Sequence, residues 1–173
     1  MAFMKILHIV GFKNSGKTTL VSRWVQFLKT KGFSVSVIKQ HGHHGKHGSL
    51  KMPDENTDSM QFFRSGADLS IVSGGGTVQI MLNETPSFER LKKLASMDQP
   101  DILLIEGFKE EAGSKVVLVR NEVEWDELNR LNNIVLVVGV ENKSISFPRI
   151  RSRENVSALD KWLWEWCGGR ASC

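Results

Sequence analysis

Short runs of apolar residues alternate along the chain with segments in which apolar residues recur every three or four positions. The short runs are typical of buried strands, and the periodic segments are typical of helices that bury one face. We predict strands over residues 6–10, 34–39, 69–73, 77–82, 102–105, 116–119 and 134–138. We predict helices over residues 17–31, 58–63, 86–95, 125–131 and 156–166. This alternation favours an α/β fold with three layers and a mostly parallel sheet.

The two strands around Gly74-Gly75-Gly76 differ from the others, because consecutive glycines favour a tight turn and therefore an antiparallel β-hairpin arm. Six apolar side chains of this arm need cover: Ile71, Val72, Val78, Ile80, Met81 and Leu82. A two-stranded hairpin is marginally stable alone, and its open edge can pair with another chain. We therefore expect a homodimer in which two arms pair across a two-fold axis. The alternative is a hairpin that edges its own sheet.

Length and composition favour a single domain over residues 1–173. The chain is 40% hydrophobic and 24% charged, as in ordinary globular proteins, with no internal repeat or long linker. The 23 lysines and arginines only slightly exceed the 19 aspartates and glutamates, and they form no dense tract, so we expect no nucleic-acid partner. No apolar run approaches the roughly 20 residues that span a bilayer, and no signal-peptide pattern is present. We expect a cytoplasmic protein without membrane contact.

One motif bears directly on chemistry. Residues 11–18, Gly-Phe-Lys-Asn-Ser-Gly-Lys-Thr, match G-x-x-x-x-G-K-[ST] between a predicted strand and a predicted helix, which is the context of a P-loop. Backbone N–H groups of such a loop face a phosphate, the lysine reaches the outer phosphates, and the final hydroxyl binds Mg²⁺. The predicted nucleotide-binding residues here are Gly11, Lys13, Asn14, Ser15, Gly16, Lys17, Thr18 and Thr19.

A second candidate element is the strand that ends at Glu106-Gly107. A buried strand that ends in a carboxylate resembles a Walker B strand, so we predict Thr18 and Glu106 as the Mg²⁺ ligands; the alternative for Glu106 is an ordinary acid at a strand end. Asp58 has two open interpretations: it approaches Mg²⁺ or a water molecule, or it caps the following helix. Asp58 and Glu106 are therefore the candidate catalytic residues.

Residues 40–57 form a long predicted loop that is rich in histidine and glycine. The loop follows a strand end, which is where open α/β sheets bind ligands. His41, His43 and His44 are compatible with contact to an anionic substrate, with a transition-metal site, or with a solvated loop.

Five segments of the chain carry a more specific pattern: Gly11–Thr19, Lys39–His44, Thr57–Ser59, Arg64–Ala67 and Glu106–Lys109. Together they resemble the molybdopterin-guanine dinucleotide biosynthesis protein B family over residues 5–140. The resemblance implies a GTP-binding accessory factor for attaching GMP to molybdopterin. It also implies a homodimeric P-loop GTPase with slow hydrolysis, acting beside the guanylyltransferase (protein A of the same pathway).

Guanine selection is weakly encoded. An N-K-x-D motif would read guanine, but Asn142-Lys143-Ser144 is followed by Ile145 where the aspartate should stand. Asn142 and Lys143 still follow a predicted strand at the right place for contacts to the base. The preference for GTP over ATP therefore depends on the resemblance.

The leading hypothesis is a GTP-binding adapter in molybdenum cofactor maturation, at most a slow GTPase. We see no glutamine placed to orient water and no obvious arginine finger. One alternative is a small-molecule or nucleotide kinase, for which Arg149, Arg151 and Arg153 would form a lid; these residues otherwise form a basic solvated loop. Another alternative is a metallochaperone GTPase that uses His41, His43 and His44.

Overall fold

The computed structural model describes residues 4–41, 50, 52–139 and 145–169. The chain divides into two compact units, a larger one made of Met1–Gln40 with Lys92–Cys173 and a smaller one made of His41–Leu91. The single domain expected over residues 1–173 stays a prediction. Among the described residues, no helix is long and apolar enough to cross a membrane.

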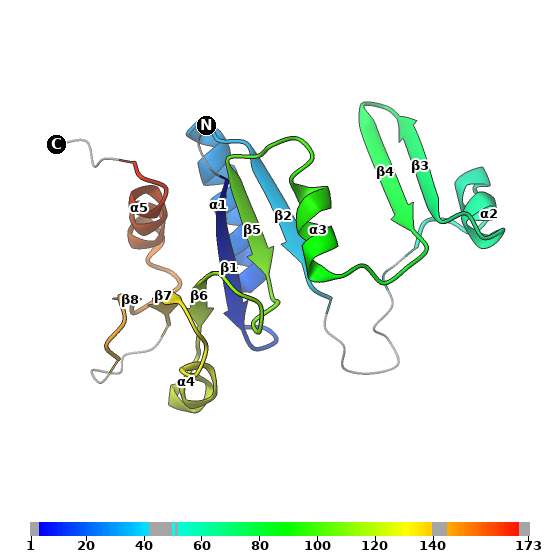
Figure 1. The fold of residues 1–173 in the computed structure, drawn as a ribbon. Coiled ribbons are helices and arrows are strands. Elements are labelled where there is room, and N and C mark those ends of the chain that lie inside the picture. Colours follow the sequence, from blue (N-terminus) through cyan, green and yellow to red (C-terminus); the bar gives the residue numbers. More distant parts are fainter. Residues whose placement is uncertain (1–3, 42–49, 51, 140–144, 170–173) are drawn as a thin grey trace. The chain divides into compact units, whose positions relative to one another are not determined.

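The larger unit is built on a six-stranded sheet whose order is β2-β5-β1-β6-β7-β8 (Figure 1). The strands are β1 (Lys5–Gly11), β2 (Val35–Lys39), β5 (Ile102–Glu106), β6 (Ser114–Leu118), β7 (Ile134–Val138) and β8 (Arg149–Ile150). Every pairing in this sheet is parallel. The carboxyl ends of β1, β2 and β5 therefore meet at one edge of the sheet, where parallel α/β folds place their ligands.

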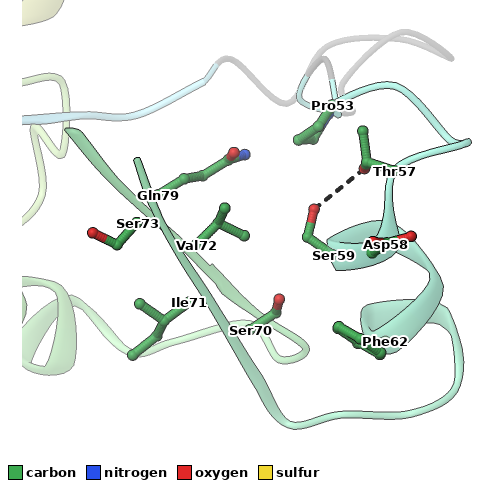
Figure 2. A pocket seen from close by; sticks show the side chains of 10 residues that line it. All are labelled: Pro53, Thr57, Asp58, Ser59, Phe62, Ser70, Ile71, Val72, Ser73 and Gln79. Atoms are coloured by element: carbon green, nitrogen blue, oxygen red, sulfur yellow. Dashed lines mark hydrogen bonds between the residues drawn. The ribbon is translucent and has the colours of Figure 1, made fainter. Parts of the chain in front are cut away.

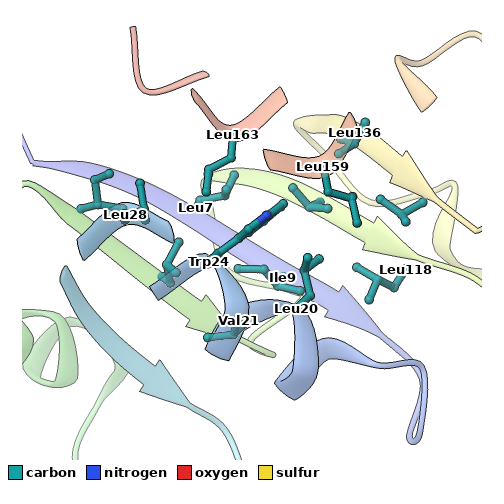
Figure 3. Close-up of a cluster of buried hydrophobic side chains, with 14 residues drawn as sticks. Leu7, Ile9, Leu20, Val21, Trp24, Leu28, Leu118, Leu136, Leu159 and Leu163 are labelled. Atoms are coloured by element: carbon teal, nitrogen blue, oxygen red, sulfur yellow. The ribbon is translucent and has the colours of Figure 1, made fainter. Parts of the chain in front are cut away.

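Helices cover both faces of this sheet, which gives the expected three layers. Helices α1 (Lys17–Thr30) and α5 (Val156–Trp166) lie on one face. Trp24 of α1 is fully buried there, among leucines of the sheet and of α5 (Figure 3). Helix α4 (Glu122–Leu128) packs Trp125 against valines of the other face. The predicted three-layer α/β fold with a mostly parallel sheet is confirmed.

The smaller unit contains α2 (Asp58–Arg64) and the antiparallel pair β3 (Leu69–Gly74) and β4 (Thr77–Leu82). Gly75 and Gly76 have φ values of +58° and +77°, as a two-residue hairpin turn of type I′ requires, so the predicted hairpin is confirmed. Met60, Ser70 and Met81 are buried within this unit.

Several bounds differ from the prediction, and three differences have a clear physical cause. Helix α3 (Phe88–Ala95) begins two residues late, because the Ser87 hydroxyl accepts the Arg90 N–H at 3.3 Å as a cap. Helix α4 begins three residues early, because the Asn121 side chain caps it by accepting the Glu124 N–H at 3.0 Å. Strand β8 was not predicted, because two residues carry no periodicity.

Candidate functional site

The loop between β1 and α1 has the backbone conformation that the P-loop motif predicts. At Gly11 (φ +154°) a Cβ would lie 2.6 Å from the Leu118 carbonyl oxygen and 2.7 Å from Ser15 Oγ, so no larger residue fits. Asn14 and Gly16 are left-handed, with φ of +63° and +91°. Left-handed residues in a tight loop help to turn backbone N–H groups toward one concavity, a geometry that suits an anion.

The lysine of the motif is folded across its own loop. Lys17 Nζ donates to the Phe12 carbonyl oxygen at 2.6 Å and to Ser15 Oγ at 3.4 Å. Burial lowers the pKa of Lys17, and the charge of Glu106 acts in the opposite direction. Both contacts are with the loop itself, so an anion held in the loop would find the ammonium close by.

A carboxylate, a hydroxyl and an ammonium meet beside this loop. Thr18 Oγ1 lies 2.9 Å and 3.0 Å from the two carboxylate oxygens of Glu106. Lys39 Nζ lies 2.6 Å from Glu106 Oε1 and 3.0 Å from Thr18 Oγ1. Sheet register explains the meeting, because Glu106 pairs with Ile9 of β1 on one side and with Lys39 of β2 on the other. The structure thus brings Thr18 and Glu106 together, and their role as Mg²⁺ ligands stays a prediction.

The donor set fits a small hard cation. Glu106 is buried at the end of β5 and Thr18 lies in the first turn of α1, so both oxygens are held by regular elements. A carboxylate and a hydroxyl are oxygen ligands of the kind that Mg²⁺ prefers, with remaining positions left to water and phosphate. Lys39 shows directly that a positive charge is accommodated between these oxygens.

The turn after β5 is fixed by a residue to which the sequence assigned no role. Gln40 Oε1 accepts the Phe108 N–H at 2.8 Å, and the Gln40 N–H donates to the Glu106 carbonyl oxygen at 2.9 Å. Gly107 has φ +95°, and a Cβ there would lie 2.9 Å from Gln40 Cβ. The expectation was that no glutamine is placed to orient water, and it stays a prediction, because the Gln40 side chain is engaged with the Phe108 N–H. Gln40 lies at the site because it directly follows Lys39, which pairs with Glu106.

Arg153, which the sequence analysis named only as part of a kinase lid or of a solvated loop, is a second residue at this site. Its Nη1 donates to the Ser15 carbonyl oxygen at 2.5 Å, and a Cβ on Gly16 would lie 3.1 Å from the same nitrogen. The alternative of a basic solvated loop over 149–153 holds only in part. Arg151 and Arg153 are exposed, but Arg149–Ile150 form β8 and Arg153 is anchored on the P-loop. Three alternating arginines were the available signal, but only the β7–β8 pairing aims Arg153 at the loop.

The remaining candidates lie elsewhere. Asp58 begins α2 in the smaller unit, where it lines a cleft of about 500 Å³ together with Phe62, Gln79 and the hydroxyls of Thr57 and Ser59 (Figure 2). No contact with the P-loop is described for Asp58, so its catalytic role stays a prediction.

Several candidates are exposed or fall outside the described residues. Lys13, Asn14 and Thr19 are exposed on or beside the P-loop, and His41 is exposed after β2. His43, His44, Asn142 and Lys143 lie outside the described residues. Ile145, which stands where a guanine-reading aspartate would be, is buried in the α4-side core with Trp125 and Phe147.

Comparison with known proteins decides the family. Residues 6–140 match the family model described as MobB, molybdopterin guanine dinucleotide synthesis protein B. The chain belongs to the MobB family. This MobB chain is 33% identical to a probable molybdopterin-guanine dinucleotide biosynthesis adapter protein of Bacillus subtilis, over 76% of the chain and 75% of that protein. It is 30% identical to the Haemophilus influenzae adapter protein, over 95% and 93%. A crystal structure of a MobB homologue from Bacillus stearothermophilus superposes with a TM-score of 0.76 at 29% identity, covering 96% of the chain and all of that structure.

Proposed function

We propose that this chain is a GTP-binding adapter in molybdenum cofactor biosynthesis, where it supports the attachment of GMP to molybdopterin beside the guanylyltransferase. Relatives that match most of the chain are named as adapters for molybdopterin-guanine dinucleotide biosynthesis. The cytoplasmic location expected from the sequence is part of this proposal.

The contact between Thr18 and Glu106 carries the nucleotide part of the proposal. It places a hydroxyl and a buried carboxylate 2.9 Å apart at the end of a loop with P-loop backbone geometry. In this arrangement the N–H groups of the loop hold the phosphates and Lys17 pairs with the outer ones. Thr18 and Glu106 then hold Mg²⁺, which neutralises phosphate charge when it is bound.

Equilibrium binding and thermal unfolding with Mg–GTP and Mg–ATP test this proposal. A ligand at 100 times its dissociation constant stabilises the folded chain by about 2.7 kcal/mol. We expect Mg–GTP to stabilise the wild type, and Lys17→Ala to lose this effect while its unliganded melting temperature stays the same. Stabilisation of Lys17→Ala equal to that of the wild type would contradict the P-loop assignment. Equal stabilisation by ATP would remove the guanine preference, which rests on family membership alone.

The contacts of Arg153 and Gln40 favour slow hydrolysis, as expected of an adapter rather than of a fast enzyme. A transition-state arginine adds about 10³–10⁵ in rate, but the guanidinium of Arg153 is held on the Ser15 carbonyl. Gln40 is likewise held by the Phe108 N–H. We expect single-turnover hydrolysis of Mg–GTP to be slow, and a rate of tens per second for the isolated chain would contradict the adapter role.

We also propose that the chain acts as a homodimer through its hairpin. Leu69, Ile71, Val78 and Ile80 share one face of the β3–β4 pair, because Ile71 pairs with Ile80 and side chains alternate along each strand. These four residues, here called the apolar stripe, are 46–59% exposed. A two-stranded sheet is marginally stable alone, and it becomes more stable when its exposed apolar side chains are buried. We propose that the stripe of a second copy buries them, with the two copies related by the expected two-fold axis.

A further inference from the structure

Lys39 occupies an unusual place for a lysine at the end of a strand. Its ammonium contacts both groups that we assign to Mg²⁺, at 2.6 Å from Glu106 Oε1 and 3.0 Å from Thr18 Oγ1. We propose that Lys39 is an internal cation that competes with Mg²⁺ for these oxygens and leaves them when the metal binds. This inference rests on the proposed function, because it concerns the same nucleotide site.

The two cations compete for these oxygens. Mg²⁺ binds oxygen at about 2.0–2.1 Å, so a metal on Glu106 and Thr18 would lie within roughly 4 Å of an ammonium that keeps its hydrogen bonds to the same atoms. Like charges at that separation repel strongly in a partly buried site. Metal binding therefore requires that Lys39 release Glu106.

The two side chains of the ion pair differ in how easily they move. The Glu106 side chain is 7% exposed and is held at the end of β5, whereas the Lys39 side chain is 49% exposed. Lysine carries its charge on a flexible four-carbon stem, so the ammonium can swing into solvent or toward a phosphate without a change in the backbone. Lys39 is thus the mobile partner and Glu106 the fixed one.

The ammonium of Lys39 also stabilises the site when no metal is bound. A buried carboxylate without a partner is costly, and Lys39 compensates its charge. The same compensation lowers the affinity of the site for a free divalent ion, so that the metal enters only with the added negative charge of a nucleotide. Lys39 is in this sense a positioning residue that makes metal binding depend on the nucleotide.

Titration with Mn²⁺ in the absence of nucleotide, followed by electron paramagnetic resonance, tests the competition. We expect Lys39→Met to bind Mn²⁺ at least about tenfold more tightly than the wild type, a change equal to about 1.4 kcal/mol. Lys39→Arg, which keeps the charge, should remain as weak as the wild type. Lys29→Met is the matched control, because it removes the same charge from an exposed position at the other end of α1. Glu106→Gln added to Lys39→Met should abolish the gain.

Unchanged or weaker Mn²⁺ binding by Lys39→Met would overturn the competition, and so would an equal gain in Lys29→Met. If Lys39→Met fails to fold, Lys39→Gln, which removes the charge but keeps hydrogen-bonding groups, decides by the same criteria. Failure of the proposed function is distinguishable, because it would be seen as a wild type that does not bind Mg–GTP, whereas the Mn²⁺ titration contains no nucleotide.

Discussion

The guanidinium of Arg153 donates a hydrogen bond of 2.5 Å to the carbonyl oxygen of Ser15, in the middle of the P-loop. The Ser15 carbonyl and the Gly16 N–H belong to one planar trans peptide, so they point in opposite directions. By holding the carbonyl, Arg153 also sets the direction of the N–H that follows it. A residue just before α5 thereby orients an amide of the phosphate loop.

We expect Arg153→Ala to weaken Mg–GTP binding by about tenfold. A hydrogen bond to a charged group contributes about 1.5–3 kcal/mol, and without it part of the binding free energy is spent on ordering the P-loop. Arg153→Lys should recover part of the affinity. Arg130→Ala, at an exposed position after α4, is the control for the loss of a positive charge. Isothermal titration calorimetry measures all three variants, and an affinity of Arg153→Ala equal to that of the wild type would show that the loop holds its shape without this bond.

Thr18→Ala and Glu106→Ala should each weaken GTP binding more in the presence of Mg²⁺ than in EDTA. The reason is that both side chains are assigned to the metal, whereas the loop N–H groups and Lys17 contact phosphate directly. Fluorescence titration with a labelled nucleotide under both conditions gives the ratio. An equal loss with and without Mg²⁺ would contradict the metal role. Thermal unfolding of each variant without ligand separates this effect from a loss of structure.

Stability should fall as the pH drops below about 6.5, the ordinary pKa of histidine. Burial, and then the charge of Lys115, lower the pKa of His8, so the folded chain binds a proton at this ring less readily than the unfolded chain does. As the pH falls, the unfolded chain binds more protons at this histidine than the folded chain does. The free energy of unfolding therefore falls by up to about 1.4 kcal/mol per pH unit. Urea denaturation between pH 7 and pH 5 measures this slope.

His8→Gln should flatten the pH dependence over the same range. The carboxyl groups of Asp101 and Glu124 also have lowered pKa values, but their ordinary values of 3.8 and 4.5 confine their effect to lower pH. A variant whose stability falls as steeply as that of the wild type between pH 7 and pH 5 would assign the slope to another group.

Ile80→Lys should convert a dimer to a monomer in sedimentation velocity, because it places a charge in the centre of the apolar stripe. Val123→Lys is the matched control, since Val123 is also an exposed apolar residue but lies on α4 of the other unit. A wild type that sediments as a monomer at micromolar concentration would refute the dimer without any variant.

The sequence predicted those parts of the site that are formed by residues close to one another along the chain. The P-loop is a continuous motif between a strand and a helix, so its position follows from local pattern alone. Strand β7 and helix α5 were likewise predicted with their observed bounds, because their apolar periodicity is strong.

The parts that escaped prediction depend on strand order. Lys39 and Glu106 meet because β2 and β5 are neighbours, and nothing within either segment specifies this pairing. Arg153 reaches Ser15 only because β8 adds to the sheet beside β7. Ile145 shows that sequence position alone does not reveal a residue's role. It stands where a guanine-reading motif would have an aspartate, but it belongs to the hydrophobic core.

The central position of β1 also has a consequence for synthesis on the ribosome. Lys5 pairs with Ile102 and Leu7 pairs with Ser114. Strand β1 therefore cannot pair until β5 and β6 have been synthesised, roughly 100 residues later. At translation rates of about 5–20 residues per second, this delay lasts about 5–20 s. During that time Trp24 and Leu28 of α1 have no sheet to cover them. The nascent chain therefore leaves the apolar face of α1 uncovered until β5 emerges, and Glu106, the carboxylate of the proposed nucleotide site, is the last residue of that strand to arrive.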